Sequence, residues 1–230
     1  EFSVAAYRFG HSQIRPSYRL NFGPTGGSPF FAFVFDDTQD PNNPDPPDLR
    51  GGKRAPRRFV DWQTFFNFGD GNFRPNKRID GKLSSVVMLL PGSRGPAPGL
   101  PADGVQSLAS RNLMRHVNFG IPSGQAIARR MGVPALTAVQ LDALTPFGME
   151  KSTPLWFYIL KEAELMENGL RLGPVGGRIV GEVFIGLLKA DESSYLASQP
   201  NWTPVLPSAI PGDFRITDLL TFAGVVPPLE

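Results

Sequence analysis

The chain has 230 residues, of which 41% are hydrophobic, so it can bury a core and we expect one domain or a large part of one. It contains no cysteine and only two histidines, which excludes the usual zinc sites, iron–sulfur clusters, thiol nucleophiles and disulfide frameworks. The formal net charge of +2 does not predict a nucleic-acid partner, and no apolar run approaches the roughly 20 residues of a membrane span.

Glycine and proline are frequent, with 25 and 24 residues, and predict many ordered loops between helices of modest length. A first helix is predicted over residues 2–15, because Pro16 lacks an amide proton and disfavours the α region for the residue before it. On this helix Arg8 lies three residues before His11, so a cation and a ligand nitrogen share one face. A lone histidine is more often a core or surface residue than a ligand, so this segment alone does not decide the function.

The next part of the chain alternates loops with short apolar segments. Residues 36–58 are polar and rich in proline and predict a long surface loop, without the ligand pattern of an EF-hand calcium site. The basic end of this loop is a candidate anion patch, although a solvated loop is favoured. Asp61 is a candidate N-cap for a short helix that packs Trp62, Phe65 and Phe66 into the core. The apolar run Val86–Leu90 fits a strand or a helix equally well.

The stretch of residues 107–130 is the second informative one. Asn112 and Arg115 are three residues apart, so they project together from one helical turn. Leu108 and Leu113 are expected to turn into the core.

The C-terminal half begins with two predicted helix starts. Thr137 and Gln140 form a capping box for a short helix that reaches about Leu144. The dipeptide Thr153-Pro154 caps a longer helix that ends at Gly169.

Two more helices are predicted beyond that point. Residues 175–189 are apolar and contain four glycines, which we interpret as close helix packing. A phosphate-binding loop is disfavoured there, because no strand precedes the glycines and no Lys-Ser or Lys-Thr follows them. Residues 216–223 are expected to form a terminal helix.

Two motifs, Tyr7-Arg8-Phe9-Gly10-His11 and, about a hundred residues later, Arg111–Arg115, occur in an order that resembles the proximal side of the animal-type haem peroxidases. This superfamily includes myeloperoxidase, bacterial peroxidase-like proteins and, more distantly, the cyclooxygenases; the resemblance points to the bacterial branch. It implies a mainly α fold of the haem peroxidase type, with long ordered loops and little β. Residues 1–230 would form the C-terminal, proximal part of one haem peroxidase domain.

The resemblance also implies roles for four residues. His11 would be the axial ligand of the haem iron, and Asn112 would accept a hydrogen bond from the second nitrogen of its ring, which orients a ligating histidine and tunes the metal. Arg8 and Arg115 would hold the haem propionates.

In this family the distal histidine, the distal arginine and the carboxylates that form ester bonds to haem precede the proximal helix. His116 cannot replace the distal histidine, because it lies four residues after Asn112 on the same predicted helix. The chain also starts at Glu1 directly in the predicted site helix, without a signal peptide. We therefore expect a proteolytic fragment or a separate chain that works with an upstream segment or a second polypeptide.

The implied function is that of an oxidoreductase, a haem peroxidase that oxidises a small donor with hydrogen peroxide. Haem would be the cofactor, with covalent attachment only through the missing part. The resemblance leaves calcium open as a further cofactor, but not one that this chain would hold. The sequence does not decide the localisation, and the family favours a secreted or extracytoplasmic one.

Two alternative functions stay open. The first is a haem fatty-acid dioxygenase, in whose family the radical tyrosine lies three residues before the ligand. Here Arg8 occupies that place and Tyr7 is one residue off. The second is a haem-free or inert peroxidase-like module with a binding or structural role.

Overall fold

The computed structural model describes residues 1–16, 18–22, 60–88, 105 and 107–226. Within these ranges the chain is mainly helical and contains no sheet, only an isolated antiparallel bridge between Ile210 and Asp213. This confirms the predicted mainly α fold. The chain divides into two compact units, one of Glu1–Arg15 with Asn76–Pro200 and one of Pro16–Pro75 with Asn201–Glu230.

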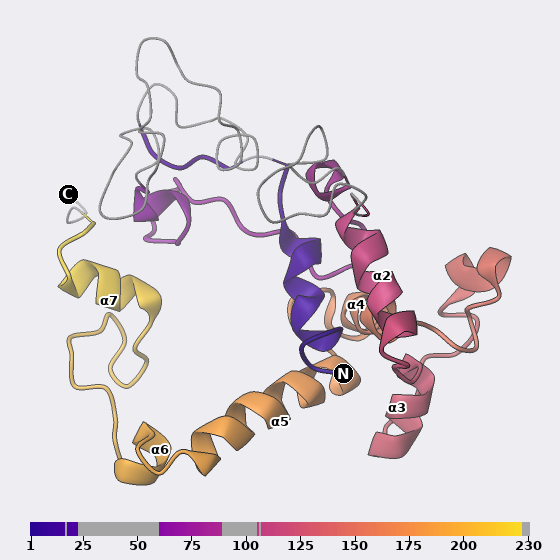
Figure 1. The fold of residues 1–230 in the computed structure, drawn as a ribbon. Coiled ribbons are helices and arrows are strands. Elements are labelled where there is room, and N and C mark those ends of the chain that lie inside the picture. Colours follow the sequence, from indigo (N-terminus) through magenta and orange to yellow (C-terminus); the bar gives the residue numbers. More distant parts are fainter. Residues whose placement is uncertain (17, 23–59, 89–104, 106, 227–230) are drawn as a thin grey trace. The chain divides into compact units, whose positions relative to one another are not determined.

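The first unit is built around α4 (Leu155–Glu167), which contacts η1, α2, α3 and α5 (Figure 1). The other helices of this unit are the 3₁₀-helices η1 (Ala6–Gln13), η4 (Ser85–Val87) and η5 (Asp142–Phe147) and the α-helices α2 (Leu108–Asn118), α3 (Gly124–Met131), α5 (Pro174–Ala190) and α6 (Tyr195–Ser198).

Helix α4 is central because its side chains are buried on several faces. Leu155, Tyr158, Ile159 and Leu160 are all inaccessible to solvent and belong to one hydrophobic core. A helix that is apolar around most of its circumference needs neighbours on all those sides. The approach of α3 is close enough that a Cβ on Gly124 would lie 1.9 Å from the Tyr158 ring, so only glycine fits there.

The predicted helix over residues 2–15 is a 3₁₀-helix limited to Ala6–Gln13. The predicted end before Pro16 is correct, since the chain leaves the helix at Ile14 with an extended backbone. The apolar run that fitted a strand or a helix begins with the single turn η4, and its last two residues lie outside the described ranges.

Only Asn112 is fully buried among the residues of α2. The prediction that Leu113 turns into the core is wrong, because this side chain is 38% exposed, and Leu108 is only partly buried. The face that α2 turns inward therefore carries a polar side chain at its centre.

The two predicted helix starts form differently. Thr137 N donates to Gln140 Oε1 at 2.9 Å and Gln140 N donates to Thr137 Oγ1 at 3.3 Å, so the capping box forms, but it closes a turn before η5. The dipeptide Thr153-Pro154 does precede α4, but Pro154 is the N-cap residue and no side chain makes a cap bond. The Thr153 hydroxyl instead donates to Met149 O at 2.8 Å. The left-handed residues Asn168 and Gly169 do end α4, as predicted for the glycine.

The close packing predicted for the glycines of α5 holds only in its first half. A Cβ on Gly176 would lie 3.1 Å from the Ile159 side chain, whereas Gly181 and Gly186 have nothing within 4 Å. The second half of α5 correspondingly exposes Phe184 and Leu187.

The second unit contains η3 (Trp62–Thr64) and α7 (Ile216–Phe222). Asp61 is the N-cap residue of η3, as predicted, but its side chain makes no cap bond, because its carboxylate accepts a hydrogen bond from Phe22 N at 2.8 Å. The helix predicted through Phe66 is one 3₁₀ turn, and Trp62 is 38% exposed rather than core. The predicted loop of residues 36–58 lies outside the described residues.

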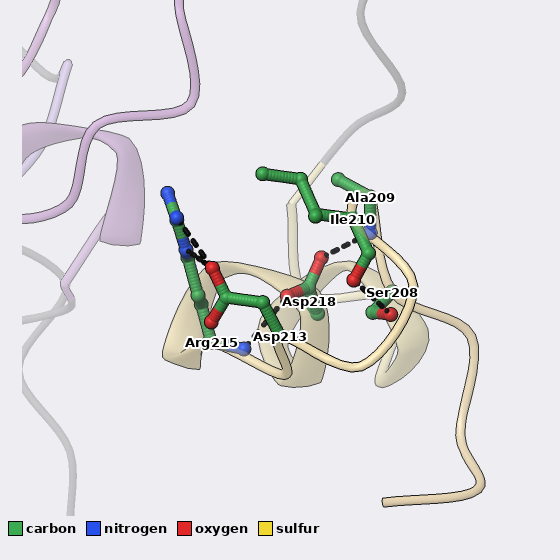
Figure 2. A network of polar contacts seen from close by, with 6 residues as sticks. All are labelled: Ser208, Ala209, Ile210, Asp213, Arg215 and Asp218. Carbon is green, nitrogen blue, oxygen red and sulfur yellow. Dashed lines mark hydrogen bonds and ion pairs between the residues drawn. The ribbon is translucent and has the colours of Figure 1, made fainter.

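Helix α7 matches the predicted terminal helix of residues 216–223 to within one residue. The carboxylate of Asp218 organises its first turn by accepting hydrogen bonds from Arg215 N at 2.7 Å and Ala209 N at 2.8 Å (Figure 2). These bonds hold the pKa of Asp218 below its usual range. The Arg215 guanidinium pairs with Asp213 beside it (Figure 2).

Across the described ranges, no helix combines the length and the apolar character that crossing a membrane requires.

Candidate functional site

The first part of the site is η1, which presents Arg8 and His11 together. Residues three apart eclipse one another in a 3₁₀-helix, so the predicted shared face survives the change of helix type. Three hydrogen bonds secure the backbone of this helix. Trp156 Nε1 donates to Arg8 O at 3.2 Å, Lys77 Nζ donates to Ser12 O at 3.2 Å, and Ser12 Oγ donates back to Phe9 O at 2.8 Å.

The second part of the site is α2, which begins with an N-cap that was not predicted. Ser107 Oγ accepts a hydrogen bond from Ser110 N at 3.3 Å. One and a half turns later α2 places Asn112, which is 1% exposed, against η1. The structure brings the amide Nδ2 of Asn112 to 2.8 Å from His11 Nδ1, although the two residues are 101 positions apart in the sequence.

Arg115 completes a row of three side chains. Its Nη1 donates a hydrogen bond to Asn112 Oδ1 at 3.3 Å, so Asn112 lies between the guanidinium and the imidazole. All four residues singled out from the sequence therefore gather at one place: His11 contacts Asn112, Asn112 contacts Arg115, and both Arg8 and Arg115 act electrostatically on His11.

The electrostatics of the site favour a neutral imidazole. Burial lowers the pKa of His11 from its ordinary value, and the positive charges of Arg8 and Arg115 lower it further. Burial also lowers the pKa of Arg8, and so does the charge of Arg115. A neutral ring keeps a lone pair that can bind a metal ion.

The positive charge of this site has no acidic partner in the part of the chain that the structure describes. No carboxylate there forms an ion pair with Arg8 or Arg115. The Arg8 Nε atom is buried and makes no hydrogen bond to any described residue. Because a buried N–H without an acceptor costs about 1–3 kcal/mol, the arrangement suits an anionic ligand that would supply the acceptor.

His116 has a different position and a different role. Its Nδ1 accepts a hydrogen bond of 3.5 Å from Leu155 N, the first N–H of α4. Pro154, the residue before Leu155, has no side chain that can cap α4. His116 therefore supplies the acceptor for the first N–H of this helix. Burial lowers the pKa of His116, which keeps the ring neutral and able to accept.

Sequence reasoning missed the residues that fix the backbone of η1. Trp156 lies 148 positions after Arg8, and Lys77 lies 65 positions after Ser12. A tryptophan in a buried helix and a lysine in a loop carry no sequence signal for such bonds. Tyr7 was named for the dioxygenase alternative; its ring stacks on Phe2 at 4.9 Å and meets Phe184 edge to face at 5.4 Å, and it is 53% exposed.

A separate hollow of about 450 Å³ lies between α3 and α5. Its walls are mostly apolar, with Ile127, Met131 and Ile179 among them, and none of the four candidate site residues lines it.

No protein-family model and no curated protein matches the chain. The family assignment therefore remains the prediction drawn from the two motifs.

Proposed function

We propose that this chain supplies the proximal half of a haem site in a peroxidase, in which His11 would bind the haem iron. The observation that carries the proposal is the 2.8 Å contact between His11 and the buried Asn112. A ligating histidine almost always has a hydrogen-bond partner on its other ring nitrogen. The buried Asn112 meets the ring of His11, 101 positions away, and meets this requirement once its Oδ1 faces Nδ1–H.

The residues present also fit the charge of haem. Haem carries two propionates, and the site offers two guanidinium groups that lack acidic partners among the described residues. The buried and unpaired Nε of Arg8 is an available donor. Charge-assisted hydrogen bonds of this kind are each worth about 1.5–3 kcal/mol where solvent is largely excluded. A bound dianion would also relieve the repulsion between Arg8 and Arg115.

Bound haem would supply the redox chemistry with hydrogen peroxide, and the chain's own residues would position it. Trp156 and Lys77 hold the carbonyls of η1, so that Arg8 and His11 keep their common face. Asn112 orients the His11 ring from α2. The distal residues that handle the peroxide proton would come from an upstream segment or a second polypeptide.

The dioxygenase alternative is less well supported. Its radical tyrosine would need to stand where Arg8 stands, and Tyr7 instead belongs to an aromatic cluster with Phe2 and Phe184. A visible absorption spectrum of the native protein tests the inert-module alternative. Bound haem gives a Soret band, and a haem-free module gives none.

The test uses two matched histidine variants of the assembled protein. We expect His11→Ala to lose or grossly shift the Soret band, because it removes the axial bond. His116→Gln should keep the band, since glutamine retains an acceptor for Leu155 N. An unchanged Soret band in His11→Ala would remove the basis of the proposal.

A third variant tests the partner of the ligand. Asn112→Leu should retain haem but reduce peroxide-dependent oxidation of a donor by about 10–100-fold, the usual effect of losing such a partner. Tyr7→Phe should stay within a few-fold of the parent enzyme. Loss of oxygen insertion into a fatty acid in Tyr7→Phe would instead favour the dioxygenase.

A further inference from the structure

We propose that Arg115 decides, through Asn112, which ring nitrogen of His11 carries the proton, and that a carboxylate bound at Arg115 thereby frees His11 Nε2 for a metal. The first half of this inference concerns the chain without any ligand. The second half rests on the proposed haem function.

The starting point is the direction of the two hydrogen bonds. A guanidinium only donates, a side-chain carbonyl oxygen only accepts and a side-chain amide nitrogen only donates. Arg115 Nη1 donates to Asn112 Oδ1 at 3.3 Å, which turns Asn112 Nδ2 toward His11 Nδ1 at 2.8 Å. Nδ1 must then be the acceptor and carries no proton. A neutral imidazole has one ring proton, so in this arrangement it lies on Nε2.

This arrangement leaves no ring nitrogen ready to bind a metal. The lone pair of Nδ1 is taken by Asn112, and Nε2 is protonated. Ligation through Nε2 requires the proton to leave Nε2 and a proton to join Nδ1, so that the ring stays neutral and changes only its tautomer. Nδ1–H then needs an acceptor, which Asn112 can offer only if its amide turns over and presents Oδ1.

The turned amide is incompatible with the present position of Arg115. It would point Asn112 Nδ2, a donor, at the guanidinium, also a donor, in place of the 3.3 Å hydrogen bond. Arg115 therefore has to find another acceptor when the tautomer changes. The bond it gives up is longer than the usual 2.9–3.0 Å, and a carboxylate is a stronger acceptor than an amide oxygen.

Carboxylate binding and metal binding are thus coupled through one amide. A carboxylate that draws Arg115 away leaves Asn112 Oδ1 without its donor, and the free Oδ1 can accept from His11 Nδ1–H. By linkage, a metal on Nε2 strengthens carboxylate binding at Arg115 by the same factor. Arg8 has no contact with Asn112 among the described bonds, so its effect on this tautomer should be small.

The experiment reads the tautomer directly by nitrogen NMR. The full 230-residue chain is labelled with ¹⁵N-histidine; it has only two histidines, and His116→Gln identifies the signals of His11. The spectra are recorded at about pH 8, above the ordinary histidine pKa, where a protonated and a bare ring nitrogen resonate far apart. We expect the unliganded chain to show the proton of His11 on Nε2.

Three variants then isolate the role of Arg115. Arg115→Met removes the donor and should shift the ratio of Nε2–H to Nδ1–H about tenfold toward Nδ1–H, the effect of one hydrogen bond. Arg115→Lys keeps a donor and should restore the parent ratio. Arg8→Met removes a neighbouring charge and should leave the ratio within about twofold, because it touches neither hydrogen bond.

Metal-free protoporphyrin is the probe for the coupling, because it carries the two carboxylates and no iron. Its binding should move the His11 proton to Nδ1 in the parent chain. An unliganded parent with its proton on Nδ1 would overturn the inference without any variant. An Arg115→Met spectrum identical to the parent, or an equal shift in Arg8→Met, would also overturn it. A chain that does not bind the porphyrin contradicts the proposed function, and the unliganded spectra then decide the role of Arg115 alone.

Discussion

The first unit contains fully or partly buried ionisable groups at two places, and the two places differ in how these groups are paired. The carboxylate of Glu162 is inaccessible to solvent and accepts hydrogen bonds from Val175 N, at 3.0 and 3.1 Å, and from Gly176 N at 3.1 Å. At the candidate site, Arg8 and Arg115 gather around His11, and no acidic side chain in the described ranges pairs with either of them.

The two places differ in whether the fold itself supplies a partner for the ionisable group. The side chain of Glu162 reaches from α4 to the start of α5, where N–H groups and the helix dipole favour an anion. Gly173, the N-cap residue of α5, has no side chain that could accept from these groups. The protein thus supplies the partner itself. At the candidate site the described chain supplies two cations, and none of its carboxylates pairs with them.

The largest effect on stability should come from removing the Glu162 carboxylate. Glu162→Ala leaves the N–H groups of Val175 and Gly176 buried without an acceptor and should lower the free energy of unfolding by about 2–4 kcal/mol. Glu162→Gln keeps one carbonyl acceptor and should cost less than half of that. Urea denaturation of both variants measures the difference, and equal losses would show that hydrogen bonding is not what Glu162 contributes.

The second prediction concerns Gly173, which packs against the side chain of Glu162. A Cβ on Gly173 would lie 2.4 Å from Glu162 Cγ, so Gly173→Ala should destabilise the protein by about 1–3 kcal/mol through overpacking. Gly181, inside α5, has open space, so Gly181→Ala should stabilise by about 0.5–1 kcal/mol through the higher helix propensity of alanine. Thermal unfolding of both variants gives the test, and the same sign for both would contradict the difference in packing between the N-cap of α5 and its second half.

The third prediction is a pH dependence. Burial raises the pKa of Glu162 above its ordinary 4.5, against the smaller opposing effect of the Gly176 and Val175 hydrogen bonds. A raised pKa in the folded state means that the folded protein binds the proton more tightly than the unfolded chain. The stability that this gives is fully present below about pH 4.5 and is lost as the pH rises through the folded value.

The measurement compares the parent with Glu162→Gln, which cannot titrate. The difference in unfolding free energy, parent minus variant, should fall as the pH rises from about 4.5 and become constant above the folded pKa. A difference that rises over this range would mean that the three backbone hydrogen bonds outweigh burial.

The smallest effect should come from the candidate site itself. Arg8→Gln removes one of two repelling cations and should change the stability by less than about 1 kcal/mol, in the stabilising direction. Arg178→Gln is the matched control, since it breaks an exposed pair with Glu182 worth about 0.3–0.5 kcal/mol. Chemical denaturation of the unliganded chain measures both. If Arg8→Gln lowered the free energy of unfolding by several kcal/mol, Arg8 would be a structural residue like Glu162, and the two places would not differ in this respect.

Local patterns predicted those elements whose signals lie within a few residues. The long helices α4 and α5 and the terminal α7 follow from apolar content and the helix-ending Gly169, and their positions agree with the structure to within a few residues. Patterns did not separate a 3₁₀-helix from an α-helix in η1, because both place Arg8 and His11 on one face.

Features that depend on distant partners were not predictable from local pattern. Glu162 in an apolar helix gives no sign that the start of α5 packs over it, and Thr153 looked like a cap although its hydroxyl donates to Met149 O. Leu113 was assigned to the core by its apolar character, yet the neighbouring polar Asn112 occupies the buried position.

The two motifs contain the four side chains that would hold haem, so the local sequence decided which residues could form the site. The tertiary structure alone decided that these side chains meet, since η1 and α2 are about a hundred residues apart and only their packing on α4 brings Asn112 to 2.8 Å from His11. It also decided the direction in which the pKa values of the site are shifted. Burial and mutual repulsion, which depend on three-dimensional proximity, set the pKa directions of His11 and Arg8, and no residue pattern along one chain encodes those distances.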